Sequence, residues 1–258
     1  MKRLNILWIG LISVLMTACY DDYEKDYDKS MVYFASQKPL RTLVADTDMS
    51  IKVGVAIGGK REVHTDDWAT FKIDPSLLDG TGLTLMPESY YQLADPNKMT
   101  ISNPNLAIAD VKVTFSDAFY DDNDALDKHY AIPFRLVDHN QDEVSTDVNG
   151  QLKDYSIVVV KFVSQYHGTY FVKGKVTNLS TQQVTEYNNK DLSRNITRDF
   201  VSLGRNKVRR PGFGQTLESN ESVNLTVNPD GSVSIEAGGS VAITDASATL
   251  DPAAESLE

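Results

Sequence analysis

Residues 49–59 read MSIKVGVAIGG, and the fold class follows from this stretch. Its residues fall into two alternating sets, Ile51, Val53, Val55 and Ile57 in one and Lys52, Gly54 and Ala56 in the other. Successive side chains of a β-strand point to opposite faces of the sheet. The period of two therefore predicts a strand with one buried face.

Similar segments recur through the first part of the chain. They lie at 31–35, 106–117, 129–139 and 155–163, separated by clusters rich in Gly, Pro, Asn and Asp. Short strands at this spacing predict an all-β fold with a β-sandwich. The last segment, YSIVVVKFV, is nearly continuous in apolar residues and reads as a strand buried on both faces. Pro133 lacks a backbone donor, so we expect an edge strand or a bulge there.

A second β-rich unit is expected from Ser164 to the end of the chain. Strand candidates lie at 167–179, 195–204 and 239–250. Residues 222–237 read as a hairpin that turns at Asn228-Pro229-Asp230-Gly231, where Gly supplies a positive φ. We therefore predict two consecutive β-sandwich-like domains, at 31–163 and 164–258. The polar end, DPAAESLE, suggests that the second domain is cut short or that its last strand is irregular.

The N-terminus has the pattern of an export signal. Lys2 and Arg3 precede fifteen uncharged residues, which are too few to span a membrane, so residues 1–18 read as a signal peptide. Leu15-Met16-Thr17-Ala18-Cys19 resembles a lipobox, in which the cysteine becomes the acylated first residue of the mature protein. The alternative is an ordinary signal peptide followed by a chance cysteine.

An acidic tether, residues 19–30, follows that cysteine. It resembles the surface-export signal of Bacteroidetes-type lipoproteins, and it also reads simply as a solvated linker. We expect an outer-membrane lipoprotein that is anchored by Cys19 and faces the cell exterior.

Composition limits the classes of partner and ligand that the protein is expected to bind. The chain carries a formal charge of −11, and removing Lys2 and Arg3 leaves −13, which argues against nucleic acid. The four histidines are far apart and in no ligand spacing, so we expect no metal site and no cofactor. Residues 116–130 crowd five aspartates, but they lack the Gly and Glu of a calcium loop and read as an exposed acidic loop.

A family resemblance rests on two segments. They are LMPESYYQLADPNKMTISNPNLAIADVKVTF, residues 85–115, and HYAIPFRLVD, residues 129–138. They resemble the N-terminal domain of unknown function of Bacteroidetes surface lipoproteins, although residues 102–105 replace the usual turn glycine. The segment from Tyr166, YHGTYFVKGKVTNL, is similar to a companion C-terminal domain. The resemblance implies that the first domain is Ig-like, in proteins of which some precede glycoside hydrolase or lectin-like domains in polysaccharide utilisation.

Candidate ligand-binding residues are exposed aromatics and a basic segment. Sugar binding by sandwich proteins rests on aromatic faces with polar neighbours, which points to Trp68 and to Phe119 with Tyr120. The alternative for Trp68 is a place in the core. Residues 190–214 carry a net charge of +5, and Arg209 with Arg210 are candidates for anionic sugars. The alternative is edge protection and pairing with the acidic first domain.

No pair of carboxylates is singled out by spacing, so we predict no enzymatic activity. The predicted function is a non-catalytic surface lipoprotein that binds or scaffolds polysaccharide or host glycans. One alternative is a structural or adhesin-type subunit that contacts surface proteins. A second is an accessory protein of a separate glycoside hydrolase.

Overall fold

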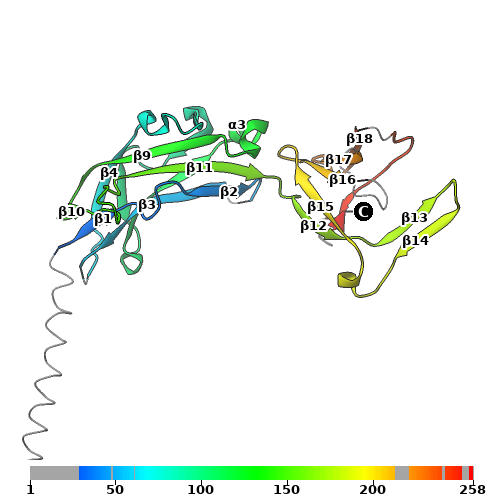
Figure 1. The fold of residues 1–258 in the computed structure, drawn as a ribbon, viewed down its shortest axis with the longest axis horizontal. Coiled ribbons are helices and arrows are strands. Elements are labelled where there is room, and N and C mark those ends of the chain that lie inside the picture. Colours follow the sequence, from blue (N-terminus) through cyan, green and yellow to red (C-terminus); the bar gives the residue numbers. More distant parts are fainter. Residues whose placement is uncertain are drawn as a thin grey trace, which may run out of the picture.

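The computed structural model describes residues 29–47, 49–60, 62–212, 221–239, 242–251 and 256–257. Cys19 and the tether as far as Asp28 lie outside these residues, so lipidation stays a prediction. Figure 1 shows two β units that meet where strand β11 ends. The first unit corresponds to residues 31–163, and the domain boundary at Ser164 remains a proposal.

Eleven strands form the sheet of the first unit. Their bounds are β1 Met31–Tyr33, β2 Leu40–Val44, β3 Ser50–Gly58, β4 Trp68–Ile73, β5 Thr84–Leu85, β6 Tyr91–Leu93, β7 Lys98–Ile101, β8 Ile108–Phe115, β9 Tyr130–His139, β10 Glu143–Val144 and β11 Tyr155–Val163. Short helices lie between them: η2 Pro75–Leu78, η3 Glu88–Tyr90, η4 Pro104–Leu106, α3 Asp117–Tyr120 and η5 Asn123–Leu126.

The strand order is that of an Ig-like sandwich. The path runs β10-β1-β3-β8-β7-β4-β9-β11-β2. Its first half, β1-β3-β8-β7, matches the order A-B-E-D, and β4-β9-β11 matches C-F-G. Strand β1 pairs with β3 in the first half. The chain then crosses to the second half, where β2 pairs in parallel with β11. The expected all-β, Ig-like class is confirmed.

The core lies between the inward faces of the two halves. The strand at 50–58 buries the face predicted from its alternation, and β11 is buried on both faces as predicted. Core residues from both halves include Val55, Val111, Val113, Ile132, Phe134, Val158 and Val160. Each such side chain contributes about 1.5–3 kcal/mol when fully buried.

Pro133 lies in an interior strand, so the expectation of an edge or a local bulge was wrong. Strand β9 pairs with β4 on one side and β11 on the other, and the register shift lies between Thr70 and Phe71. The Pro133 carbonyl accepts from the Asp74 N–H, just past the end of β4. The proline nitrogen therefore faces the gap between β4 and β5, where no ladder hydrogen bond is lost.

The second unit contains a five-stranded sheet in the order β12-β15-β16-β17-β18. Its elements are β12 Gly168–Phe171, β13 Gly174–Asn178, β14 Gln183–Tyr187, η6 Leu192–Arg194, β15 Thr197–Ser202, β16 Lys207–Pro211, β17 Glu221–Val227, β18 Val233–Gly239, β19 Leu250–Asp251 and β20 Ser256–Leu257. The predicted hairpin forms β17 and β18, with Leu225 opposite Ile235 and Gly231 at φ 83°.

Two strand predictions in this unit were too long. The segment 167–179 divides into β12 and β13, because Gly174 takes a φ of 149° and the chain leaves the sheet to form the β13–β14 hairpin. Figure 1 shows this hairpin extending away from the sheet. Residues 242–248 are not strand, and residues 242–246 line a cavity of about 270 Å³ together with Val223 and Ile235 of the sheet.

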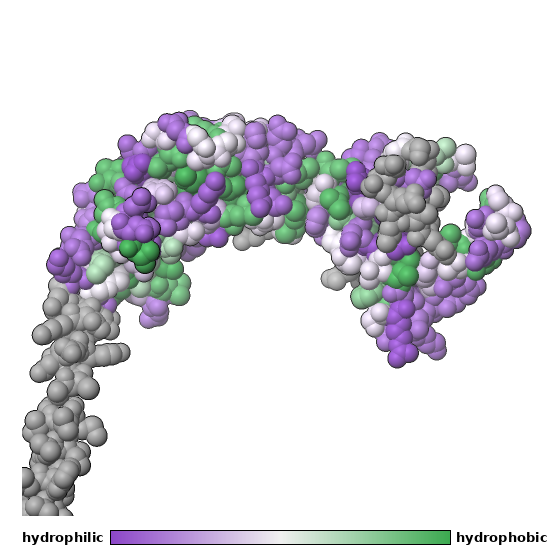
Figure 2. All heavy atoms as spheres, viewed as in Figure 1, coloured by the Kyte–Doolittle hydropathy of each residue, from purple (hydrophilic) through white to green (hydrophobic). Residues whose placement is uncertain are grey.

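Polar and apolar residues are interspersed over both units on the face that Figure 2 shows. Within the described residues, no helix has both the length and the apolar character needed to span a bilayer.

Candidate functional site

Trp68 begins β4 and is partly exposed. Its backbone N–H donates to the Asn140 side-chain oxygen at 2.9 Å, and the Asn140 amide nitrogen donates to the Asp66 carbonyl at 3.2 Å. Ala69, the next residue, is fully buried. The tryptophan side chain therefore points outward from a strand whose start is fixed.

Buried Asp67 anchors the loop that leads to Trp68. It accepts hydrogen bonds from Lys60 at 2.6 Å, from the His64 N–H at 2.8 Å and from Gln141 at 2.9 Å. Burial alone raises the pKa of Asp67, but these hydrogen bonds outweigh it, and the pKa lies below its ordinary value. No local sequence pattern indicates this anchor, because the partners of Asp67 lie up to 74 residues away.

The outward side chains beside Trp68 form a row across four strands. Trp68 lies opposite Thr100 of β7, Thr100 opposite Asp110 of β8, and Asp110 opposite Gly54 of β3. Neighbouring strands are about 4.8 Å apart, so the row from Trp68 to Gly54 spans about 14 Å. We call Trp68, Lys98, Thr100, Asp110 and Lys52 the Trp68 face.

The charged members of the Trp68 face are engaged within it. The Lys98 ammonium lies 5.4 Å from the centroid of the Trp68 ring, and Lys52 lies 3.2 Å from Asp110. The face thus combines an aromatic surface with a carboxylate, a hydroxyl and two ammonium groups. Such a combination stacks on the C–H side of a sugar ring and hydrogen-bonds to its hydroxyls.

Phe119 and Tyr120 are core residues, so the prediction that they present exposed faces was wrong. Both side chains are fully buried in α3, where their rings pack on Phe162 at 5.7 and 5.3 Å between centroids. The acidic sequence around them hid this packing. Asp122 in that loop accepts from the hydroxyls of Tyr90 and Tyr130, and it thereby helps to hold the loop on the core.

Arg209 and Arg210 lie on opposite faces of β16. Arg209 shares the face of Lys207, which pairs with Glu236 at 2.7 Å. Arg210 shares the face of buried Val208, and burial lowers its pKa, as does the neighbouring charge of Arg198. The two arginines therefore do not form one anion-binding fork, and neither lies in the unit that holds Trp68.

Arg205, which was not singled out from the sequence, joins the two units. Its guanidinium contacts Asp46 at 2.5 Å and Asp117 at 2.9 Å, and it lies 5.7 Å from the centroid of the Tyr120 ring. The Asp46 hydrogen bond raises the pKa of Arg205. Its place in the +5 segment was the available signal, and the contact fits the alternative reading of that segment as a partner of the acidic first domain.

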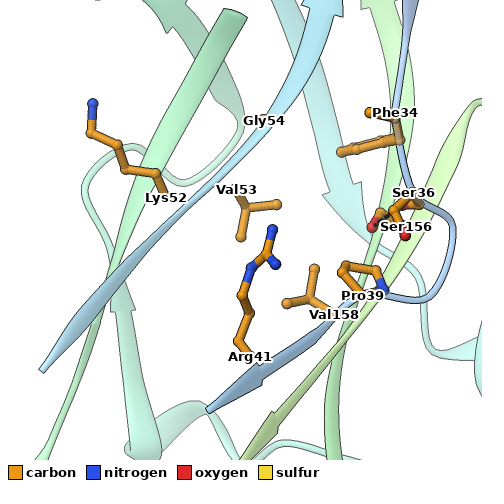
Figure 3. Close-up of a pocket in the computed structure, with 10 residues that line it drawn as sticks. Phe34, Ser36, Pro39, Arg41, Lys52, Val53, Gly54, Ser156 and Val158 are labelled. Atoms are coloured by element: carbon orange, nitrogen blue, oxygen red, sulfur yellow. Dashed lines mark hydrogen bonds between the residues drawn. The ribbon is translucent and has the colours of Figure 1, made fainter. Parts of the chain in front are cut away.

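A cavity lies at the opening between β2 and β3. It has a volume of about 110 Å³ and is lined by Phe34, Ala35, Ser36, Pro39, Arg41, Lys52, Val53, Gly54, Ser156 and Val158. Figure 3 shows how these side chains surround it. No group of three or more potential metal ligands occurs among the described residues.

Comparison with known proteins supports the fold and the resemblance. A family model described as "-like, N-terminal domain" matches residues 27–143. A Bacteroides ovatus protein of unknown function has the same fold, with a TM-score of 0.68 at 22% sequence identity, over 83% of this chain and 79% of that chain. The expected kind of N-terminal domain, found in Bacteroides proteins, is therefore confirmed.

Other solved structures resemble the chain more loosely. An auxiliary nutrient-binding protein from Bacteroides thetaiotaomicron gives a TM-score of 0.45 at 12% identity, over 85% of this chain and 79% of that chain. This likeness is too loose to support an argument about function. No curated protein sequence matches the chain.

Proposed function

We propose that this chain, which carries the N-terminal domain of Bacteroidetes-type surface proteins, is a non-catalytic glycan-binding lipoprotein of the outer membrane that faces the cell exterior. The proposal places the glycan on the Trp68 face and the lipid on Cys19. The observation that carries it is the partly exposed Trp68 beside Thr100 and Asp110 in one row of an Ig-like sheet.

The mechanism is stacking followed by hydrogen bonding. A sugar ring lies against the indole, and the Thr100 hydroxyl and Asp110 carboxylate bond to its hydroxyls. The hydrogen bond from Trp68 to Asn140 and the Asp67 anchor fix the strand before the ligand arrives, so little conformational entropy is lost on binding.

The Lys98 ammonium determines which sugars the Trp68 face prefers. It occupies one side of the indole at 5.4 Å, so a neutral sugar uses the other side. A uronic acid or sulfated sugar gains from Lys98 as a counter-ion. Each contact is weak, and many copies anchored to one membrane raise the overall avidity for a polymer.

Residues 20–258 and their Trp68→Ala variant test the proposal by electrophoresis through gels that contain neutral or anionic polysaccharides. We expect retention by at least one glycan, and at least tenfold weaker retention for the variant, because a tryptophan anchor contributes about 2 kcal/mol or more. Phe171→Ala, which removes another exposed aromatic from the second unit, is the matched control and is expected to bind normally. Equal retention of all three proteins would contradict the proposal.

A further inference from the structure

Strand β3 has an edge that β1 covers only in part. β1 pairs with β3 at Ala56 to Gly58, and none of the described strands pairs with Lys52 or Gly54 on that side. On the β8 side of β3, the Met49 carbonyl accepts from the Phe115 N–H, and the Ile57 N–H donates to the Ala107 carbonyl. The N–H and C=O groups of Lys52 and Gly54, which alternate with these, point to the open side.

The cavity of about 110 Å³ lies beside this edge. Phe34 from the segment 34–39 between β1 and β2, Val53 from β3 and Val158 from β11 supply apolar walls (Figure 3). A cavity of about 150 Å³ holds a benzene molecule, so this one has room for a single branched aliphatic side chain. An inward-pointing side chain of a strand added along β3 would be directed there, next to Val53.

Arg41 supplies a positive charge at the mouth of the cavity. Arg41 lies two residues before buried Leu43 in β2, so the two side chains share the face that is directed toward the space between the sheets. Figure 3 shows the Arg41 guanidinium between Val53 and Val158. Within the part of the chain that the structure describes, Arg41 forms no salt bridge with a carboxylate.

We propose that this opening, the β2–β3 slot, binds an extended peptide segment of a protein partner by strand addition to β3. The segment carries an aliphatic side chain that enters the cavity and an acidic side chain two residues away that pairs with Arg41. The spacing of two is required because alternate residues of a strand share a face. Main-chain hydrogen bonds to Lys52 and Gly54 supply affinity, and the cavity and Arg41 supply selectivity.

Edge protection is the competing explanation for Arg41. Inward-pointing charges at a sheet edge prevent pairing with other chains. Under that explanation, removing the charge would promote self-association, and no peptide pattern would be preferred. The two explanations therefore predict opposite results for the same variant.

The test uses residues 20–258 and fluorescein-labelled peptides built on Ser-Asp-Thr-Val-Thr-Asp-Ser, followed by fluorescence anisotropy. Three comparison peptides replace both Asp by Lys, replace Val by Gly, or move both Asp next to Val. The protein variants are Arg41→Ala, which removes the charge, and, as a matched charge removal in the second unit, Arg209→Ala. Thermal unfolding verifies that both variants fold.

We expect saturable binding of the first peptide, with about tenfold weaker binding for each comparison peptide and for Arg41→Ala, and none of this loss for Arg209→Ala. Binding of all peptides alike, or of none, would overturn the proposal. So would concentration-dependent self-association of Arg41→Ala without peptide selectivity, which would assign Arg41 to edge protection. Glycan binding does not enter these outcomes.

Discussion

At the scale of single residues, side-chain exposure distinguishes the candidate ligand-binding aromatics from one another, which the sequence alone could not do. Trp68, Phe119 and Tyr120 all sit among aspartates in the sequence, yet only Trp68 keeps an exposed part. Local polarity hid the packing of Phe119 and Tyr120 on Phe162, because that contact joins residues more than 40 positions apart. The row of Thr100 and Asp110 beside Trp68 also needed the strand register, which no local pattern specifies.

Asp74 provides a prediction at the same scale. Hydrogen bonds from Ser76 and then from Arg135 lower its pKa to about 2 from an ordinary 3.8. A depressed carboxyl pKa stabilises the folded state above the ordinary value, and the contribution is lost as the pH falls through the folded value. Asp74→Asn should therefore lower Tm at pH 7, and the difference should shrink toward zero between about pH 3.8 and pH 2.

Thermal unfolding of the wild type and of Asp74→Asn, from pH 7 down to about pH 2, measures this difference in Tm. Asp79→Asn, which alters an exposed aspartate at the other end of the same 3-10 helix, is the control and should change Tm little. A Tm difference for Asp74→Asn that stays constant down to pH 2 would show that the carboxylate charge is not its source.

At the scale of elements, periodicity predicted most of the strands. The alternation in 49–59 and the continuous apolar run in 155–163 both gave the correct faces, because burial between two layers imposes those patterns directly. The wrong strand predictions lie where a neighbouring strand, rather than the local sequence, determines the structure. Pro133 is tolerated in an interior strand because β4 ends beside it, and the candidate strand at 167–179 divides where Gly174 permits a change of partner.

Two glycines of β3 provide a matched prediction. A Cβ at Gly54 would lie closer to the Ala109 carbonyl oxygen than any real contact, whereas a Cβ at Gly58 would meet only Tyr33 at 3.8 Å. Gly54→Ala should reduce the free energy of unfolding by about 1–3 kcal/mol, since the backbone of β8 must move. Gly58→Ala should be neutral or stabilising by up to about 1 kcal/mol. Urea denaturation of both variants checks this, and equal effects would contradict the assigned β3–β8 packing.

At the scale of the whole molecule, Arg205 links the two units. It contacts Asp46 and Asp117 of the first unit from the loop between β15 and β16. Units that share a small polar interface are expected to move relative to each other unless such contacts hold them. Composition had indicated an acidic body with a basic segment, but which of its arginines meets the aspartates depends on the assembled fold.

Arg205→Ala should loosen the arrangement of the units without unfolding either one. Small-angle scattering should show a broader distribution of interatomic distances for the variant, and high salt should move the wild type in the same direction. Arg209→Ala removes a cation from the adjacent strand and should leave the scattering unchanged. Identical curves for Arg205→Ala and the wild type would show that other contacts set the arrangement.

The tryptophan content of the chain allows a direct test of whether a glycan lies on Trp68. The chain has two tryptophans, Trp8 in the predicted signal peptide and Trp68, so residues 20–258 contain a single one. The decisive measurement is the quenching of Trp68 fluorescence by acrylamide, with and without the polysaccharide that gel electrophoresis identifies. If a glycan lies on Trp68, we expect a shifted emission maximum and protection from acrylamide at saturating glycan. Glycan binding that leaves the emission and the quenching of Trp68 unchanged would place the site elsewhere and contradict the proposed site.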